Sequence, residues 1–367
     1  MNLDAYNGRR VLVTGHTGFK GSWLCEWLLS LGAEVYGFAL EPPTRPALFS
    51  QLRLARRIAS HEIGDVRDRA AVLACVKRVK PHFIFHLAAQ PIVRESYRTP
   101  AATFDTNVMG TVNVLEAVRE WRLRTGSSAP CSVVCVTTDK VYANDNSGRA
   151  FLETDPLGGD DPYSASKGAC EIVAASYRSS FFRDSSVRLA TARAGNVIGG
   201  GDWARDRIVP DAMRAFLHGR PLVVRNRRST RPWQHVLEPL CGYLMLGAAL
   251  DAGVDGADSA FNFGPDAKTV RTVGVLAEAL AAGCFRQGEV LFQSEAGAPR
   301  EALRLQLNSS KAKNVLGWRP CFGFSRTVSA VCEWYLLVNE CLEAAPEVTR
   351  RQIEDYCKIR LGKARGQ

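Results

Sequence analysis

The first 195 residues alternate short apolar runs with longer stretches of helical periodicity. Runs of apolar and β-branched residues predict strands at 10–14, 34–40, 82–88, 131–138 and 187–196. Apolar positions three and four residues apart predict helices over 20–32, 104–122 and 162–182. Strands that alternate with helices form a parallel sheet covered on both faces. We therefore expect an α/β fold built on a Rossmann-type doubly wound parallel sheet.

The regular alternation of predicted strands and helices ends after residue 195. A glycine-rich stretch, "VIGGGDW", is followed by short mixed elements, and 300–345 reads as helix and loop. The length of 367 residues suits one large domain or two fused ones. We expect residues 1–195 to form the sheet domain and residues 196–367 to form a smaller mixed α/β domain, with some strand exchange between the two.

The charge balance favours an anionic partner. Lys and Arg number 47 against 37 Asp and Glu, which gives a formal net charge of +10. The densest basic patch, "RNRRSTRP" at 225–232, lacks the interleaved aromatic residues on which nucleic-acid bases stack. A phosphate-bearing small ligand therefore explains the charge more simply than a nucleic acid.

The cysteine spacing and the length of the apolar runs indicate the cellular compartment of the protein and whether it binds a metal. Eleven cysteines are scattered without a CxxC pair or zinc-type spacing, so we expect no metal site and reduced thiols. No apolar run reaches the roughly 20 residues that span a bilayer, and no signal-peptide pattern is visible at the start. These features predict a cytoplasmic protein with no membrane or nucleic-acid partner.

A glycine-spaced loop, "VTGHTGFKG" at 13–21, joins the first strand to the first helix. Gly15, Gly18 and Gly21 would give a tight turn, close approach to a pyrophosphate and close helix packing. A turn alone would also use glycines, but the strand before and the helix after are the context that dinucleotide binding requires. We expect the whole loop to contact the cofactor, which adds His16 (toward a phosphate), Thr17, Phe19 and Lys20.

The choice between NAD and NADP stays open from these residues. The second strand ends "GFALEPPTRP" with no acid at its tip; Glu41 comes late, and Arg45 could meet a 2′-phosphate. We expect NAD, with NADP not excluded. Asp65, followed by Val66 in "GDVRD", is a candidate for the adenine amino group or, equally, for a helix N-cap.

Two further groups of residues carry acid and base chemistry. "PYSASK" places Tyr163 and Lys167 on one helix face, where the ammonium would lower the pKa of the phenol and could hold the nicotinamide ribose. The alternative is that Tyr163 and Lys167 are only a Tyr–Lys pair on the protein surface, without a catalytic role. Thr138, Asp139 and Lys140 end the 131–138 strand, where active sites of open α/β sheets lie.

In this order, TGxxGxxG, "HLAA", a strand-end Thr and YxxxK resemble the extended short-chain dehydrogenase/reductase superfamily and its NAD-dependent sugar epimerase/dehydratase family. Longer stretches resemble the CDP-glucose 4,6-dehydratase family: "HTGFKGSWL", "PPTRPALF", "GDVRD", "HLAAQPIVRESY", "TNVMGTVNVLEA", "DPLGGDDPYSASK", "ATARAGNVIGGGDWA", "RPWQHVLEPL" and "FNFGP". They span about residues 11 to 320.

The resemblance implies a hydro-lyase that converts CDP-D-glucose to CDP-4-dehydro-6-deoxy-D-glucose in deoxysugar biosynthesis. Tyr163 would take the 4-hydroxyl proton, and Thr138 and Lys167 would tune it. Asp139 would act as the general acid at the 6-hydroxyl. Lys140 would be the C5 base or would tune the acid. Another nucleotide sugar, or an epimerase reaction, is the alternative.

The resemblance also implies binding residues and an assembly. Leu87, Ala88 and Ala89 would line the cofactor; Gln90, Asn196, Arg207, Arg231 and Arg300 would face the substrate. Arg231 would bind the diphosphate, or it is one more exposed arginine of the basic patch. The helices at 104–122 and 162–182 would form the four-helix interface of a homodimer, with a tetramer as a further option, or they only cover the sheet.

This chain departs from the family at two places. Val141 stands where the family has a Cys, and residues 142–152 contain no Trp. Arg300, in "PREALRL", stands where the family has a His. Both departures fall in segments that would shape the substrate pocket.

Overall fold

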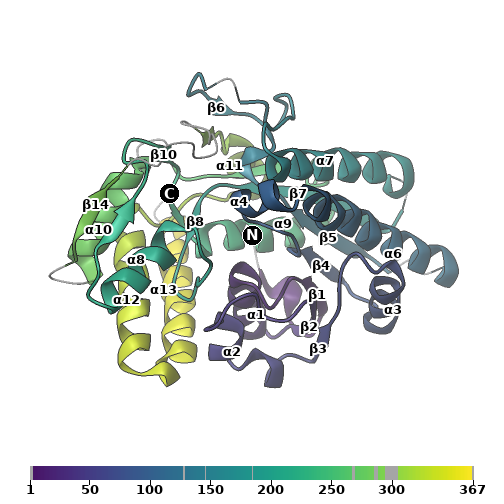
Figure 1. Ribbon diagram of the computed structural model, residues 1–367. Helices are drawn as coiled ribbons and strands as arrows, with labels where there is room; N and C mark the ends of the chain where they lie inside the picture. Colours follow the sequence, from purple (N-terminus) through teal and green to yellow (C-terminus); the bar gives the residue numbers. More distant parts are fainter. Residues whose placement is uncertain are drawn as a thin grey trace.

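A seven-stranded parallel sheet forms the centre of the protein (Figure 1). The computed structural model describes residues 3–126, 129–144, 146–183, 185–266, 269–284, 288–293 and 305–365. The strands, in spatial order, are β12 (Ala260–Phe263), β7 (Val187–Ala194), β5 (Cys131–Val136), β4 (Phe83–His86), β1 (Arg10–Thr14), β2 (Glu34–Ala39) and β3 (Ser60–Ile63). The expected Rossmann-type doubly wound sheet is confirmed.

The two faces of the sheet are covered by different sets of helices, because alternate strand residues point to opposite faces. Val11, Phe83 and Val134 belong to one apolar cluster, which α1 (Phe19–Ser30), α9 (Leu237–Asp251), α12 (Phe324–Glu340) and α13 (Ala345–Arg365) complete. Leu12 and Ile84 belong to the other cluster, under α3 (Arg69–Val79), α6 (Gly110–Thr125) and α7 (Pro162–Tyr177).

The other elements are short and surround this core. The remaining helices are α2 (Leu48–Gln51), α4 (Val93–Arg98), α5 (Pro100–Phe104), α8 (Ile208–Leu217), α10 (Val273–Cys284) and α11 (Ser310–Leu316). The 3-10 turns are η1 (Leu3–Tyr6), η2 (Leu54–Arg56), η4 (Asp139–Val141) and η7 (Leu342–Ala344), and the π-helical turns are η3 (Asp105–Met109) and η5 (Arg178–Phe182). Four two-stranded pairs are β8 (Val197–Ile198) with β11 (Gln234–His235), β10 (Thr230–Arg231) with β13 (Arg271–Thr272), β9 (Leu222–Val224) with β14 (Val290–Phe292), and β6 (Ala150–Phe151) with β15 (Gln306–Leu307).

The second half of the chain is tied closely to the first. It supplies β12 to the sheet and α9 to one of its faces, and Trp27 of α1 packs against Tyr356 of α13. The buried carboxylate of Glu238 accepts hydrogen bonds from the main chain of Cys321 and Phe322 and from the Tyr356 hydroxyl. A division into two domains at residue 195 stays a prediction.

One expectation about cysteine is wrong. Cys284 of α10 and Cys332 of α12 form a disulfide, although we expected every thiol to be reduced. The two helices pack side by side and bring the Cα atoms to 4.9 Å, a separation that disulfides require. The 48 residues between the two cysteines hide this pairing in the sequence.

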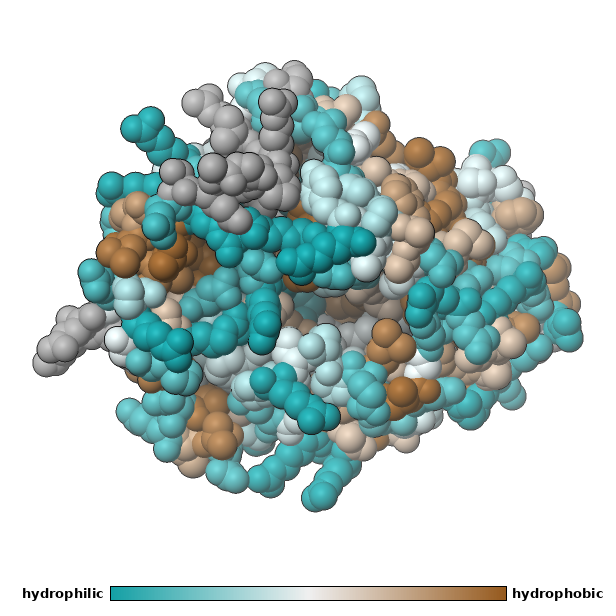
Figure 2. Space-filling view, viewed as in Figure 1, coloured by the Kyte–Doolittle hydropathy of each residue, from teal (hydrophilic) through white to brown (hydrophobic). Residues whose placement is uncertain are grey.

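The face of the protein seen in Figure 2 is mixed, with hydrophilic side chains interrupted by small separate hydrophobic patches. Within the described ranges, no helix combines the length and the apolar character that crossing a bilayer requires.

Candidate active site

The carboxyl ends of four neighbouring strands bring the chemistry-bearing segments to one edge of the sheet. The glycine loop follows β1, "LAAQ" follows β4, the Thr-Asp-Lys triplet follows β5, and Gly195 and Asn196 follow β7. Ligands of open α/β sheets bind at this edge, near the point where the strand order reverses.

The glycine loop forms a cradle that only glycine can line. Gly15 has φ of 77°, and a Cβ there would lie 2.7 Å from the nitrogen of Ala88. A Cβ on Gly21 would lie 2.2 Å from the carbonyl oxygen of Gly15. Gly18 is the N-cap of α1 and has no side chain to occupy the first N–H groups of the helix. The loop therefore fits the pyrophosphate of a dinucleotide, which binds where helix N–H groups are free.

The side chains of His16 and Thr17 brace the loop from the protein interior. The His16 ring is fully buried against Gly37, and its Nε2 lies 2.7 Å from Nδ1 of His61. Burial, with the charge of His61, lowers the pKa of His16 to about 3, so the ring is neutral. The Thr17 hydroxyl donates to the carbonyl of Leu40. Because the side chains of His16 and Thr17 are engaged in the interior, only the main-chain groups of these residues remain to contact a phosphate.

Asp65 and Val66, the residues expected near the adenine, differ in burial. Asp65 is partly exposed and accepts hydrogen bonds at 2.9 Å from both the main-chain nitrogen and Nε of Arg67. Asp68, not Asp65, caps α3, so the N-cap alternative for Asp65 is wrong. Val66 is buried beneath Gly110.

Residues 87–90 lie beside the glycine loop and are partly exposed. The nitrogen of Ala88 approaches the Thr14 hydroxyl at 3.3 Å. The Gln90 side chain donates to the Thr103 hydroxyl and accepts from the main chain of Ile92, so its amide shapes the local loop.

Thr138, Tyr163 and Lys167 come together in a buried cluster, each less than a tenth exposed. The Lys167 ammonium donates to the carbonyl of Val136 at 3.2 Å. Burial raises the pKa of Tyr163 to about 12, and a hydrogen bond with Thr138 opposes this only in part. That Lys167 lowers the pKa of Tyr163 stays a prediction; in this structure, burial of the phenol has the largest effect on that pKa.

Asp139 is the most unusual group of the site. Its Oδ1 accepts a hydrogen bond from the Thr138 hydroxyl at 3.0 Å, and its buried Oδ2 has no hydrogen-bond partner in the described part of the chain. Burial raises the pKa of the Asp139 carboxyl, and Lys140 and the Thr138 hydrogen bond oppose this rise. A Cβ on Gly195 would lie 2.7 Å from Oδ2, so glycine is required beside the carboxyl. This carboxyl is suited to hold and release a proton.

Lys140 and the two residues after it differ in their exposure to solvent. Lys140 is partly exposed, and its main-chain nitrogen lies 3.4 Å from the Thr138 hydroxyl. Val141 and Tyr142 are buried, and Tyr142 stacks on Phe151 with ring centroids 4.8 Å apart. Val141, Tyr142 and Phe151, which lie within these departures, form a small apolar cluster with Leu305 and Leu307.

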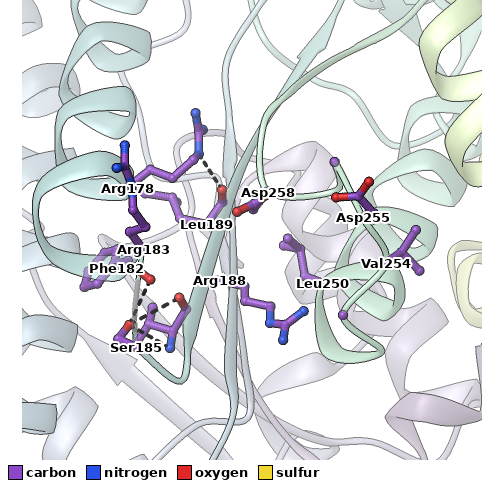
Figure 3. A pocket seen from close by; sticks show the side chains of 13 residues that line it. Arg178, Phe182, Arg183, Ser185, Arg188, Leu189, Leu250, Val254, Asp255 and Asp258 are labelled. Carbon is purple, nitrogen blue, oxygen red and sulfur yellow. Dashed lines mark hydrogen bonds between the residues drawn. The ribbon is translucent and has the colours of Figure 1, made fainter.

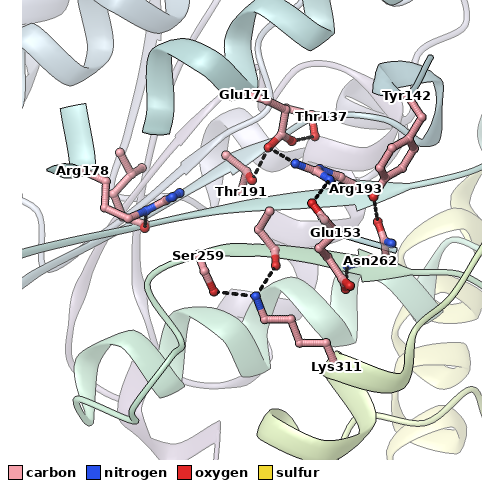
Figure 4. A network of polar contacts seen from close by, with 12 residues as sticks. Thr137, Tyr142, Glu153, Glu171, Arg178, Thr191, Arg193, Ser259, Asn262 and Lys311 are labelled. Carbon is pink, nitrogen blue, oxygen red and sulfur yellow. Dashed lines mark hydrogen bonds and ion pairs between the residues drawn. The ribbon is translucent and has the colours of Figure 1, made fainter. Parts of the chain in front are cut away.

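Figure 4 shows a buried polar network around Glu171 of α7, which includes Thr137, the residue before the Thr138-Asp139-Lys140 triplet. Glu171, two turns after Tyr163 on α7, accepts hydrogen bonds from the hydroxyls of Thr137 at 2.5 Å and Thr191 at 2.6 Å. It also pairs with Arg193 at 2.8 Å, and both side chains are almost fully buried. Arg193 in turn donates to the Tyr142 hydroxyl. The network joins α7 to the ends of β5 and β7 and fixes the triplet against the helix.

The residues expected to bind substrate surround the same cluster. Arg231 is buried, not exposed as one more member of the basic patch, and its charge lowers the pKa of Asp139. Arg207 pairs with Asp202 at 3.0 Å, and its charge also lowers the pKa of Tyr163. Asn196 is partly exposed and accepts a hydrogen bond from the main chain of Gln234. Arg300 lies outside the described residues.

Sequence reasoning missed two residues of this cluster. Asp202, in the quoted "GGGDW", holds Arg207 in place. Tyr243 lies within an apolar helix, where no pattern distinguishes it from the core; its hydroxyl lies 3.5 Å from the Lys20 ammonium.

A separate pocket of about 250 Å³ lies at the opposite, amino edge of β7 and β12 (Figure 3). Arg178, Arg188, Asp255 and Asp258 line it, and Arg178 donates to the carbonyl of Leu189. None of the expected site residues contributes to it. In the described ranges, no group of three or more His, Cys, Asp or Glu side chains could hold a metal ion.

Comparison with known proteins places this geometry in context. The family model for GDP-mannose 4,6 dehydratase matches residues 12–331. A CDP-glucose 4,6-dehydratase of Salmonella typhimurium is 44% identical over 340 residues, which cover 91% of this chain and 92% of the relative. These matches confirm the resemblance expected from the motifs.

Solved structures show the same fold. A dTDP-glucose 4,6-dehydratase from Streptomyces venezuelae, solved with NAD, has a TM-score of 0.75 at 24% identity and covers 92% of this chain and 99% of its own. The Thermus thermophilus UDP-glucose 4-epimerase, in complex with NAD, has a TM-score of 0.74 at 25% identity and covers 89% of this chain and 98% of its own.

The Glu171–Arg193 pair should dominate local stability. Glu171→Gln would leave the Arg193 guanidinium buried with a weaker partner, and we expect a loss of about 3 kcal/mol in the free energy of unfolding. Urea denaturation followed by circular dichroism would measure it. Glu278→Gln is the matched control, since the exposed Glu278–Arg227 pair should contribute less than about 1 kcal/mol. Equal midpoints for the two variants would contradict the role given to Glu171.

Proposed function

Since the chain belongs to the GDP-mannose 4,6 dehydratase family, within the extended short-chain dehydrogenase/reductases, we propose that it is a hydro-lyase that 4,6-dehydrates a nucleotide-activated hexose. The substrate we propose is CDP-D-glucose and the product CDP-4-dehydro-6-deoxy-D-glucose. The carrying observation is the buried Asp139 carboxyl beside Thr138 and Tyr163, an acid that simple oxidation at C4 would not need. The relative named CDP-glucose 4,6-dehydratase, 44% identical, supports the choice of sugar nucleotide.

NAD is the cofactor that the site fits. The glycine cradle and the uncapped start of α1 would hold its pyrophosphate, and Lys167 would hold its nicotinamide ribose. When bound, NAD would supply the hydride acceptor for oxidation at C4 and the hydride donor for reduction at C6. The NAD-bound dehydratase and epimerase with the same fold support NAD over NADP.

Tyr163 is the base for the 4-hydroxyl. Its pKa, raised to about 12 by burial, must fall when cofactor and sugar bind, and the charge of Arg207 and the Thr138 hydrogen bond already act in that direction. The proton that leaves the sugar oxygen passes to the phenolate. Thr138 bridges this base to the acid, because its hydroxyl donates to Asp139.

Asp139 is the acid for the 6-hydroxyl. The raised pKa keeps a proton on the buried carboxyl, and the unpaired Oδ2 leaves a position from which the proton can be donated. The proton at C5, made acidic by the 4-ketone, goes to Lys140, which is adjacent in sequence and partly exposed toward solvent. Loss of that proton and protonation of the leaving oxygen together release one water molecule.

The cations of the site would bind the diphosphate of the substrate. Arg231 is buried and its charge acts on Asp139, which supports a diphosphate site beside the acid. Asn196, which follows β7, and Arg207, whose charge acts on Tyr163, would also face the substrate. An epimerase reaction is the second candidate, because a UDP-glucose 4-epimerase shares the fold.

An assay of nucleotide sugars tests the function. Incubation with CDP-, dTDP-, UDP- and GDP-activated hexoses, followed by the absorbance of 4-keto sugars in base, should give product from CDP-glucose without net NADH. Product from another nucleotide sugar alone would overturn the substrate. A C4 epimer that keeps its 6-hydroxyl would favour the epimerase.

Replacement of the acid tests the mechanism. Asp139→Asn should lower kcat by about 10²- to 10⁴-fold, because an amide cannot donate the proton. In the unaltered protein, activity should fall as pH rises through the raised pKa of Asp139, since the donor is lost when it ionises. Asp266→Asn, the same change on the surface, should leave activity unchanged. Full turnover by Asp139→Asn would remove Asp139 from the mechanism.

We also propose a cytoplasmic homodimer built from the helical face of α5, η3, α6 and α7. Exposed apolar residues gather there, among them Phe104, Met109 and Ile172, and Phe181 of η5 continues the row past the end of α7. Ala165, Ala169 and Ile172 follow one another at helical spacing on the accessible side of α7. A tetramer would need a second interface.

A charge on this face should dissociate the dimer. Ile172→Glu buries a carboxylate in the proposed interface, and we expect monomers in analytical ultracentrifugation. Leu342→Glu places the same charge on an exposed leucine of η7, away from this face, and should keep the assembly of the unaltered protein. An unchanged sedimentation coefficient for Ile172→Glu would reject the interface.

A further inference from the structure

The pocket of about 250 Å³ at the amino edge of β7 and β12 takes no part in the proposed function (Figure 3). It lies at the opposite end of the strands from the glycine loop and the Thr-Asp-Lys triplet. Its lining comes from three segments: η5 with the residues that follow it, the start of β7, and the loop between α9 and β12. A ligand held there would not meet the groups assigned to catalysis.

Three arginines line this pocket: Arg178, Arg183 and Arg188. Arg178 is partly buried, and its Nε donates to the carbonyl of Leu189 at 2.8 Å, which fixes the plane of the guanidinium. Within the described ranges, its two terminal nitrogens have no hydrogen-bond partner and no carboxylate in ion-pair contact. Burial lowers the pKa of Arg178, because the charged form loses water. A guanidinium fixed in this way, with two free donors, suits a phosphate group.

Arg188 reaches the same pocket from β7 and lies against the turn that follows α9. Gly253 of that turn has φ of 68°, and a Cβ there would lie 2.4 Å from Nη1 of Arg188. A side chain at position 253 would therefore displace the guanidinium. Within the described ranges, Arg188 and Arg183 form no ion pair either.

Two carboxylates, Asp255 and Asp258, belong to the same lining. In Figure 3, Arg178 and Arg183 lie on one side of the pocket and Asp255 lies on the other. In the part of the chain that the structure describes, neither aspartate accepts a hydrogen bond or forms an ion pair. Carboxylates are acceptors only, so these two suit the hydroxyl groups of a ligand whose other end carries an anion.

Apolar side chains complete the pocket. Phe182, Leu189 and Leu250 line it and are themselves buried. Binding sites for small molecules combine such apolar surface with a few polar groups that fix the orientation of the ligand. The C–H groups on the face of a sugar ring could pack on this surface while its hydroxyls point to the aspartates.

We propose that this pocket is a second ligand site, which binds a small phosphorylated sugar with its phosphate on the arginines and its hydroxyls on the aspartates. Three arginines against two aspartates leave an excess of one positive charge, which favours a phosphate ester over an uncharged sugar. The volume of about 250 Å³ lies below the roughly 300–1,000 Å³ of sites for larger ligands, so a hexose phosphate suits it better than a whole nucleotide sugar. The site does not depend on the function proposed above.

Isothermal titration of the whole protein with α-D-glucose 1-phosphate tests the proposal without turnover. Arg188→Gln removes a phosphate contact and should raise the Kd by about tenfold. Asp258→Ala removes a hydroxyl acceptor and should raise the Kd for glucose 1-phosphate by a similar factor, but not the Kd for inorganic phosphate. Both positions are exposed, so the variants should fold, and circular dichroism would check this.

Two controls separate this pocket from the rest of the protein. Arg351→Gln removes an exposed arginine of α13, far from the pocket in sequence, and should leave the affinity unchanged. Arg231→Met removes a cation of the proposed substrate site and should also leave it unchanged, because that residue does not line the pocket.

Four results would overturn the proposal. The first is the absence of any glucose 1-phosphate binding to the unaltered protein, and the second is an unchanged affinity in both pocket variants. The third is inorganic phosphate binding as tightly as glucose 1-phosphate, which would indicate a site for the anion alone. The fourth is binding that Arg231→Met abolishes and the pocket variants keep, which would assign the ligand to the catalytic edge. None of these results bears on the dehydratase reaction, which the assay of nucleotide sugars tests separately.

Discussion

The buried carboxylate of Glu171 is the contact on which the site depends. One side chain receives hydroxyl groups from the residue before Thr138 and from β7, and it neutralises Arg193 in the interior. A buried ion pair costs desolvation on both sides and persists only when further hydrogen bonds complete it. Here they do, so α7 cannot rotate or slide against β5 without breaking several bonds at once. Tyr163 and Lys167 share the helix face of Glu171 and are therefore held in register with the triplet.

Burial has opposite effects on the acids and bases of this site. It raises the pKa of Asp139 and Tyr163 and lowers that of Lys20, because in each case the charged form is the one that loses water. Each group is thereby driven toward its neutral form. A substrate diphosphate and a cofactor pyrophosphate would bring negative charge, and under the proposed function the remaining cations, Arg207 and Arg231 among them, would receive it.

The C-terminal half of the chain contributes residues that pack against the catalytic residues proposed above. Gly195 leaves room for the Asp139 carboxyl, and α9 delivers Tyr243 beneath the glycine loop. The segment 142–152, where the chain departs from its family, is anchored by Tyr142 through its ring and its hydroxyl to Phe151 and Asn262.

The sequence by itself determined the sheet, the glycine loop and the Thr138, Tyr163 and Lys167 set, because each depends on local periodicity or on short spacings along one element. It also indicated the family, through motifs spread from about residue 11 to residue 320. Only the tertiary structure decided the protonation preferences and the long-range partners. Burial raises the pKa of Tyr163, Asp68 and not Asp65 caps α3, and Cys284 forms a disulfide with Cys332. Lys20 finds Tyr243 across 223 residues of chain. Desolvation and contacts between distant segments are properties of the packed interior, so no spacing along the chain encodes them.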